Sequence, residues 1–144
     1  MTDRENEVVG LEQVRFRWPG QTSDIVSIDE LSLDAGEHLF VRGSSGSGKT
    51  TLLNLLCGVH APSSGTIRLL GTDLSRLAPG RRDQFRADHI GVIFQQFNLL
   101  PYLSTLENVT LSCSFSGRKK RRASESTDVR ETARSLLGDL NLAP

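Results

Sequence analysis

The stretch that decides the fold runs from residue 43 to residue 50 and reads Gly43-Ser44-Ser45-Gly46-Ser47-Gly48-Lys49-Thr50. It matches the pattern G-x-x-x-x-G-K-[ST], in which the glycines let the backbone curl so that successive N–H groups point inward at an anion. Lys49 adds a point charge, and Thr50 adds a hydroxyl suited to Mg²⁺. The stretch therefore predicts a phosphate-binding P-loop.

The residues on either side supply the context that a P-loop requires. The apolar run 38–41 predicts a strand that leads directly into the loop. After the loop, Leu52, Leu55, Leu56 and Val59 recur at i, i+3, i+4 and i+7, which predicts a helix that packs one stripe on the sheet and ends at Gly58. The positive end of its dipole would face the anion. A flexible Gly/Ser linker, the alternative, does not predict these flanks.

Strand patterns and helix patterns alternate along the rest of the chain. Val14, Phe16 and Trp18 alternate with arginines and predict a half-exposed strand that stops at residues 19–20. Further strands are predicted near 28–33, 66–70 and 90–94, and helices near 80–87 and 105–113. A last helix follows Asp128, whose spacing to Glu131 is that of a capping box. The succession of strands and helices predicts an α/β fold.

The composition is that of one ordinary domain. The 144 residues are 37% hydrophobic, which suffices for a core. The charged N-terminus argues against a secretory signal, and no apolar stretch reaches the length of a membrane span. Cys57 and Cys113 lack metal-ligand spacing, as do the three scattered histidines, so the sequence predicts reduced, partly buried thiols and no metal cage.

Charge is balanced overall but concentrated in one segment. The formal net charge is zero, so no global field attracts nucleic acid, and we expect no nucleic-acid partner. Residues 117–127 form a polar segment that contains the basic run Arg118-Lys119-Lys120-Arg121-Arg122. We interpret this segment as a solvated linker, with contact to an anionic membrane surface as the alternative.

Four segments between about Gly10 and Leu142 resemble the nucleotide-binding domain of ATP-binding cassette (ABC) transporters. They are Ser45 to Leu53, Gly36-Glu37, Pro62-Ser63-Ser64-Gly65-Thr66-Ile67, and Ile90 to Pro101 together with Thr105-Leu106-Glu107-Asn108-Val109. The sequences of these segments most resemble those of the lipoprotein-release and macrolide-export type of ATPase. The cell-division ATPase has a similar sequence.

The resemblance implies an α/β fold of the P-loop NTPase type. It would have a RecA-like core, an N-terminal antiparallel β subdomain and the start of a helical subdomain. We expect residues 1–144 to form one such domain, incomplete at its C-terminus as in a truncated gene product or fragment. Residues 9–104 would form the β subdomain and P-loop core, and residues 105–144 the start of the helical subdomain.

The resemblance also assigns roles to individual residues. Nucleotide contacts would come from Trp18, Gly43, Ser44, Ser45, Gly46, Ser47, Gly48, Lys49, Thr50 and Thr51. Trp18 falls where the family has an aromatic residue that stacks on adenine, although it can also be a rim residue at the sheet edge. Gln95 matches the Q-loop glutamine, which binds Mg²⁺ together with Thr50, positions the attacking water and senses the γ-phosphate. Its alternatives are a polar strand end and the neighbouring Gln96 as the matching residue.

The implied function is to bind Mg-ATP and thereby energise transport by a membrane permease. Two such domains would pair, and the chain would be cytoplasmic, peripheral on the inner face of the cell membrane through the permease. The sequence lacks the LSGGQ signature, the metal-binding aspartate and the catalytic glutamate of the family, and we interpret Asp73 and Asp139 as surface carboxylates. We therefore expect ATP binding without appreciable hydrolysis.

Two other classes of function remain open from the sequence. A P-loop kinase acting on a small molecule would have the loop but no role for residues 95–101. A non-catalytic interaction module would bind nucleotide without turnover. Steady-state ATPase assays, with and without a phosphoryl acceptor, separate these classes.

Overall fold

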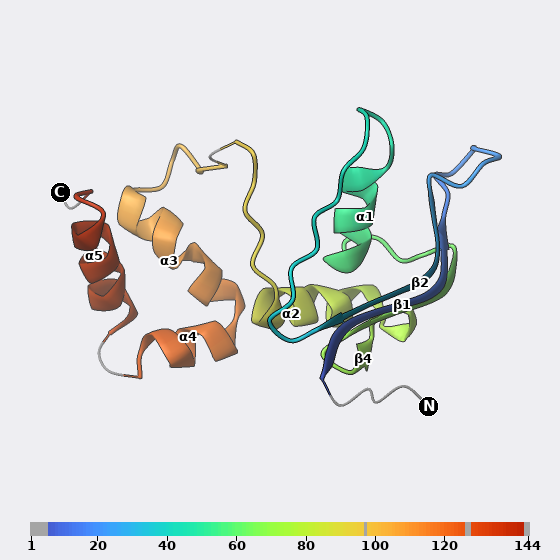
Figure 1. The fold of residues 1–144 in the computed structure, drawn as a ribbon. Coiled ribbons are helices and arrows are strands. Elements are labelled where there is room, and N and C mark those ends of the chain that lie inside the picture. Colours follow the sequence, from blue (N-terminus) through green and yellow to red (C-terminus); the bar gives the residue numbers. More distant parts are fainter. Residues whose placement is uncertain (1–5, 97, 126–127, 143–144) are drawn as a thin grey trace. The chain divides into compact units, whose positions relative to one another are not determined.

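A computed structural model describes residues 6–96, 98–125 and 128–142 of the chain (Figure 1). The chain divides into two compact units, which we call unit 1 (Met1–Asp83) and unit 2 (Gln84–Pro144). Within the described ranges, no helix is both long enough and apolar enough to cross a lipid bilayer.

Unit 1 is built on a four-stranded antiparallel sheet with the strand order β2-β1-β3-β4. The strands are β1 (Glu7–Phe16), β2 (Val26–Asp34), β3 (Ser64–Leu69) and β4 (Thr72–Asp73). Leu11 in the central strand lies opposite Leu31 of β2 and Ile67 of β3. The sheet confirms the strands predicted near 28–33 and 66–70, and it forms the expected N-terminal antiparallel β subdomain. The strand predicted near 14–18 is confirmed only up to Phe16, where β1 ends, so Trp18 lies beyond the strand.

A bulge in β1 lies opposite the first residues of β3. The pairing register of β1 with β3 shifts between Glu12 and Arg15, and Gln13 in between has a left-handed φ of 50°. Gly65 faces this bulge with a φ of 87°, and a Cβ there would lie 2.2 Å from the Gln13 carbonyl oxygen. The glycine of the segment 62–67 is therefore required by the close approach of two backbones.

The helix after the P-loop packs on this sheet as predicted. α1 (Lys49–Leu56) buries Leu52 and Leu55 against a cluster of sheet residues, which are Leu11, Val14, Phe16, Val26 and Ile67. Leu55 is fully buried, whereas Val59, the last member of the predicted stripe, is 47% exposed because it lies beyond the end of the helix. Gly58 follows the helix with a left-handed φ of 67°.

Two predicted strands are wrong. Residues 38–41 and 90–94 are assigned to no strand, and Phe40 and Ile93 are 82% and 100% exposed. A strand forms only where a neighbouring strand satisfies its N–H and C=O groups, and none of the described strands pairs with either run. Continuous apolar runs of this kind are typical of strands buried on both faces of a parallel sheet.

Unit 2 is helical. α2 (Pro79–His89) contains the boundary between the units, and η1 (Leu74–Arg76) precedes it in unit 1. α3 (Thr105–Phe115) packs against α4 (Gly117–Ala123) and α5 (Val129–Asp139). The helices predicted near 80–87, 105–113 and after Asp128 are confirmed. Asp128 caps α5 by accepting from the Arg130 N–H, and a full capping box occurs instead at α3, between Ser104 and Glu107.

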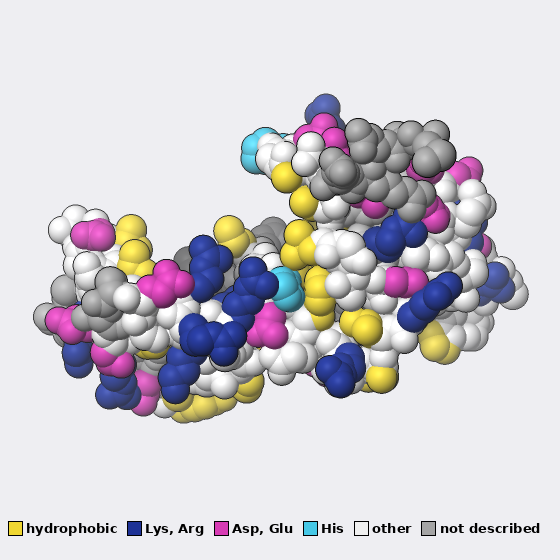
Figure 2. Space-filling view, turned by 90° about the horizontal axis from the view of Figure 1, so that it is seen from below, with side chains coloured by type: hydrophobic (Ala, Val, Ile, Leu, Met, Phe, Trp, Pro, Cys, Tyr) yellow, Lys and Arg dark blue, Asp and Glu magenta, His cyan; other side chains and the backbone are white. Residues whose placement is uncertain are grey.

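The linker predicted for residues 117–127 is also wrong in its first half, since residues 117–123 form α4. The reason is Ser116, which is fully buried and caps this helix by accepting from the Lys119 N–H at 3.0 Å. Its hydroxyl also donates to Asp88 at 2.6 Å, which ties α4 to α2. Side chains of Lys and Arg gather on unit 2 in the face that Figure 2 shows, next to acidic ones.

Replacing Ser116 by alanine should destabilise unit 2. The loss of an N-cap hydroxyl lowers the free energy of unfolding by about 1 kcal/mol, and urea denaturation measures it. The hydrogen bond from Ser116 lowers the pKa of Asp88. The stability that this hydrogen bond contributes is therefore present above the ordinary pKa of aspartate and is lost as the pH falls through the lowered pKa. Ser116→Thr keeps the hydroxyl and is the control; equal losses in both variants would contradict the capping role.

Candidate functional site: the P-loop and an aromatic cluster

The P-loop leads into the N-terminus of α1 in unit 1 (Figure 1). Gly46 and Gly48 have left-handed φ angles of 78° and 87°, and the Ser47 N–H donates to the Ser44 carbonyl at 3.3 Å. Gly48 is the N-cap of α1, and no side chain caps this terminus. The first N–H groups of the helix therefore face the loop without a capping side chain, at the positive end of the helix dipole. This arrangement suits an anion.

Close contacts explain two of the loop glycines. A Cβ at Gly48 would lie 2.6 Å from the carbonyl oxygen of Ile25, and a Cβ at Gly43 would lie 2.5 Å from the Ser47 hydroxyl. The loop thus packs directly against the backbone that enters β2. A depression of about 280 Å³ lies beside it, lined by residues 25–28, 41–43, 47–49 and 52. Ile25 gives no signal in the sequence, because its contribution is a carbonyl oxygen.

Lys49 turns its side chain back over the loop. Its Nζ donates to the carbonyl oxygens of Gly43 at 2.8 Å and Ser44 at 2.6 Å. The ammonium group is therefore held against the same curled backbone whose N–H groups would bind a phosphate. Of the next two residues, Thr50 is exposed and Thr51 is buried.

Trp18 belongs to a cluster of three rings, Phe16, Trp18 and His60, which we call the Trp18 cluster. Trp18 meets Phe16 at 5.0 Å and His60 at 5.1 Å between ring centroids, edge to face in both cases. It is 38% exposed. The loop after Trp18 and the P-loop project towards the same side of unit 1 in Figure 1. The sequence did not indicate His60, because it is far from Trp18 along the chain.

Gln95 is exposed in a bend of unit 2, whereas the P-loop belongs to unit 1. The predicted shared role of Gln95 and Thr50 at Mg²⁺ therefore stays a prediction. No group of three or more His, Cys, Asp or Glu side chains within residues 6–96, 98–125 and 128–142 could hold a metal ion.

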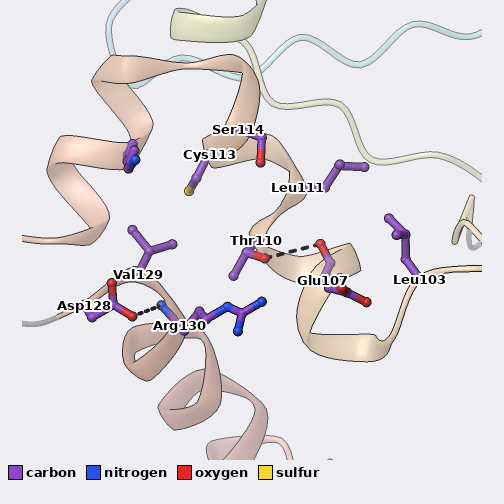
Figure 3. A pocket seen from close by; sticks show the side chains of 10 residues that line it. Leu103, Glu107, Thr110, Leu111, Cys113, Ser114, Asp128, Val129 and Arg130 are labelled. Atoms are coloured by element: carbon purple, nitrogen blue, oxygen red, sulfur yellow. Dashed lines mark hydrogen bonds between the residues drawn. The ribbon is translucent and has the colours of Figure 1, made fainter.

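A larger depression of about 470 Å³ lies in unit 2, between α3 and the start of α5 (Figure 3). Its lining combines Glu107 and Asp128 with Lys120 and Arg130. The Ser104 hydroxyl donates to Glu107 and holds the pKa of that carboxyl below its ordinary value. A lining with both acidic and basic side chains does not favour the binding of a negatively charged phosphate chain, whereas the P-loop favours it.

Comparisons with known proteins identify the family of this chain. Residues 26–143 match the ABC transporter family. The macrolide export ATP-binding/permease protein MacB of Burkholderia thailandensis is 39% identical over 135 residues, which are 92% of this chain and 20% of that protein. The lipoprotein-releasing system ATP-binding protein LolD of Chromohalobacter salexigens is 44% identical over 102 residues, which are 69% of this chain and 43% of that protein.

Solved structures of ABC cassettes share the fold. The cassette MJ0796, solved as a dimer in a post-hydrolysis state with ADP and Pi, superposes with a TM-score of 0.74 at 29% identity. The alignment covers 92% of this chain and 56% of that cassette, so the chain spans about half of it. The family match covers most of the chain and includes the P-loop. The chain belongs to the ABC transporter ATP-binding domain family.

Proposed function

We propose that this chain binds Mg-ATP, with the phosphates on the P-loop and the adenine on Trp18, as the ATP-binding part of a membrane transporter. The observation that carries the proposal is the P-loop itself: Lys49 Nζ lies 2.8 Å from the Gly43 carbonyl oxygen, beside a helix terminus that no side chain caps. A cation and helical N–H groups together form a site for a polyphosphate. Membership in the ABC transporter family favours this function over that of a P-loop kinase.

The residues of the loop suit a magnesium nucleotide. Lys49 would shift its bonds from the loop carbonyls to phosphate oxygens, and the N–H groups of residues 46–51 would bind the remaining ones. The Thr50 hydroxyl and the Gln95 amide would hold Mg²⁺, which prefers oxygen ligands and shares phosphate oxygens. The ion would neutralise charge on the phosphates. Gln95 would also orient water and report the γ-phosphate to a partner.

Partners and location follow from the relatives. MacB is named an ATP-binding/permease protein and LolD an ATP-binding protein of a lipoprotein-releasing system, while MJ0796 was solved as a dimer. By analogy, this chain would pair with a second nucleotide-binding domain and contact a permease, peripheral on the cytoplasmic face of the cell membrane. The proposal of these partners is supported by the family to which the chain belongs.

Calorimetric titration tests the binding. Mg-ATP should bind at one site per chain, inorganic triphosphate should compete with it, and AMP should bind much more weakly because it lacks the β- and γ-phosphates. Failure of triphosphate to compete would show that the P-loop is not the site.

Trp18 permits a separate test of the base contact. As the chain's only tryptophan, it reports through intrinsic fluorescence, so ATP and GTP should change its emission while triphosphate should not. Trp18→Ala should weaken ATP binding by about 1–3 kcal/mol, the usual contribution of base stacking. Trp18→Tyr should weaken it much less, since it restores an aromatic face. Equal emission changes with triphosphate and ATP would place Trp18 away from the base.

A further inference from the structure

His60 is held in place by backbone hydrogen bonds on both sides. Its N–H and that of Val59 donate to the carbonyl of Asn54 in α1, at 3.4 and 2.9 Å. On the other side, the Ser63 N–H donates to the Arg15 carbonyl at 2.8 Å, and the Ser63 hydroxyl accepts from the Arg17 N–H at 3.1 Å. The segment that carries His60 therefore bridges the end of α1 and the end of β1.

The ring of His60 contacts two aromatic residues, Phe16 in β1 and Trp18 just after the end of β1. It stacks on Phe16 with a centroid distance of 5.7 Å and an interplanar angle of 29°. It meets Trp18 at 5.1 Å and 80°. Phe16 is nearly buried and belongs to the core, so it provides a fixed base for the other two rings. Edge-to-face contacts of this kind favour one ring orientation.

We propose that His60 is a positioning residue for the nucleotide base, because it fixes the ring of Trp18 in the orientation in which a base stacks. This inference rests on the proposed function, since it requires that Trp18 bind the base. A ring that is already ordered loses less side-chain entropy on binding. Because α1 begins at the P-loop and is tied at its other end to His60, one helix joins the phosphate site to the Trp18 cluster.

The test is a double-mutant cycle on nucleotide affinity. His60→Ala should weaken ATP binding about threefold to tenfold, the range expected from freeing one side chain, and leave triphosphate binding unchanged. His60→Phe should restore most of the ATP affinity. In a Trp18→Ala background, His60→Ala should have no further effect, because His60 acts only through Trp18. An undiminished effect in that background would overturn the inference.

Fluorescence without nucleotide separates this inference from the proposed function. His60→Ala should raise the accessibility of Trp18 to acrylamide, whereas His89→Ala, which removes a histidine stacked on Phe85 in unit 2, should not. If Trp18→Ala leaves ATP affinity unchanged, the base contact fails and the inference with it. If Trp18→Ala weakens ATP binding but His60→Ala changes neither affinity nor quenching, only the role of His60 is overturned.

Discussion

Lys49→Ala should abolish most of the affinity of this chain for Mg-ATP. Nζ donates to the Gly43 and Ser44 carbonyl oxygens, and with nucleotide it would donate to phosphate oxygens instead. Hydrogen bonds to charged groups contribute about 1.5–3 kcal/mol each, so the loss of two of them should weaken binding at least roughly 100-fold. Calorimetric titration with Mg-ATP measures the change.

A matched control removes a different lysine that also donates to a carbonyl oxygen. Lys119 Nζ donates to the Ile90 carbonyl at 3.0 Å in unit 2, and Lys119→Ala should leave ATP affinity unchanged. Thermal unfolding of both variants checks that each is folded. A folded Lys49→Ala variant that binds Mg-ATP with normal affinity would show that Lys49 does not bind the phosphates.

The P-loop could be predicted from the sequence because its chemistry is local. The loop glycines, Lys49 and the helix that follows lie within a few residues of one another, and the helix begins where the pattern predicts it. Strands near 14–18, 28–33 and 66–70 were predictable for a similar reason, since strand residues alternate and turns interrupt them, whereas their antiparallel arrangement is what the resemblance to the family implies. Local patterns specify an element when the same element supplies most of its hydrogen bonds or pairs with its neighbour in sequence.

Contacts between distant residues could not be predicted in this way. His60 meets Trp18 because two hydrogen bonds tie Ser63 to Arg15 in β1 and to Arg17 just after it, and no periodicity encodes that approach. Ile25 contacts the P-loop through a backbone carbonyl, which any residue type has. The runs 38–41 and 90–94 have the composition of buried strands, yet composition does not supply a strand to pair with. In each case the missing information is the partner.

The helix at residues 117–123 shows how one contact changes an interpretation. Five consecutive basic residues repel one another and favour a solvated segment. The structure makes them helical because the buried Ser116 caps the helix, and because Lys119 reaches the Ile90 carbonyl. A serine before a basic run is a weak signal on its own, so the sequence alone does not indicate the cap.

Gly36 is a matched control for a substitution at Gly65, because the two glycines share a left-handed backbone conformation and only Gly36 has open space where a Cβ would lie. Gly36 has a φ of 86°, and a Cβ built there would meet nothing within 4 Å. Gly36→Ala should therefore lower the free energy of unfolding only by the cost of placing an L-residue in the left-handed region, about 1–2 kcal/mol. Its φ differs from that of Gly65 by one degree, since Gly65 has 87°.

Gly65→Ala should destabilise unit 1 far more, by about 3–5 kcal/mol, a loss seen when strain and a steric clash combine in a packed region. The Cβ would lie 2.2 Å from the Gln13 carbonyl oxygen and 2.6 Å from that of Glu12. Both are backbone atoms of the central strand, so relief requires β1 and β3 to separate at the bulge. Urea denaturation of the two variants measures the difference, and equal losses at Gly65 and Gly36 would show that the bulge yields without cost.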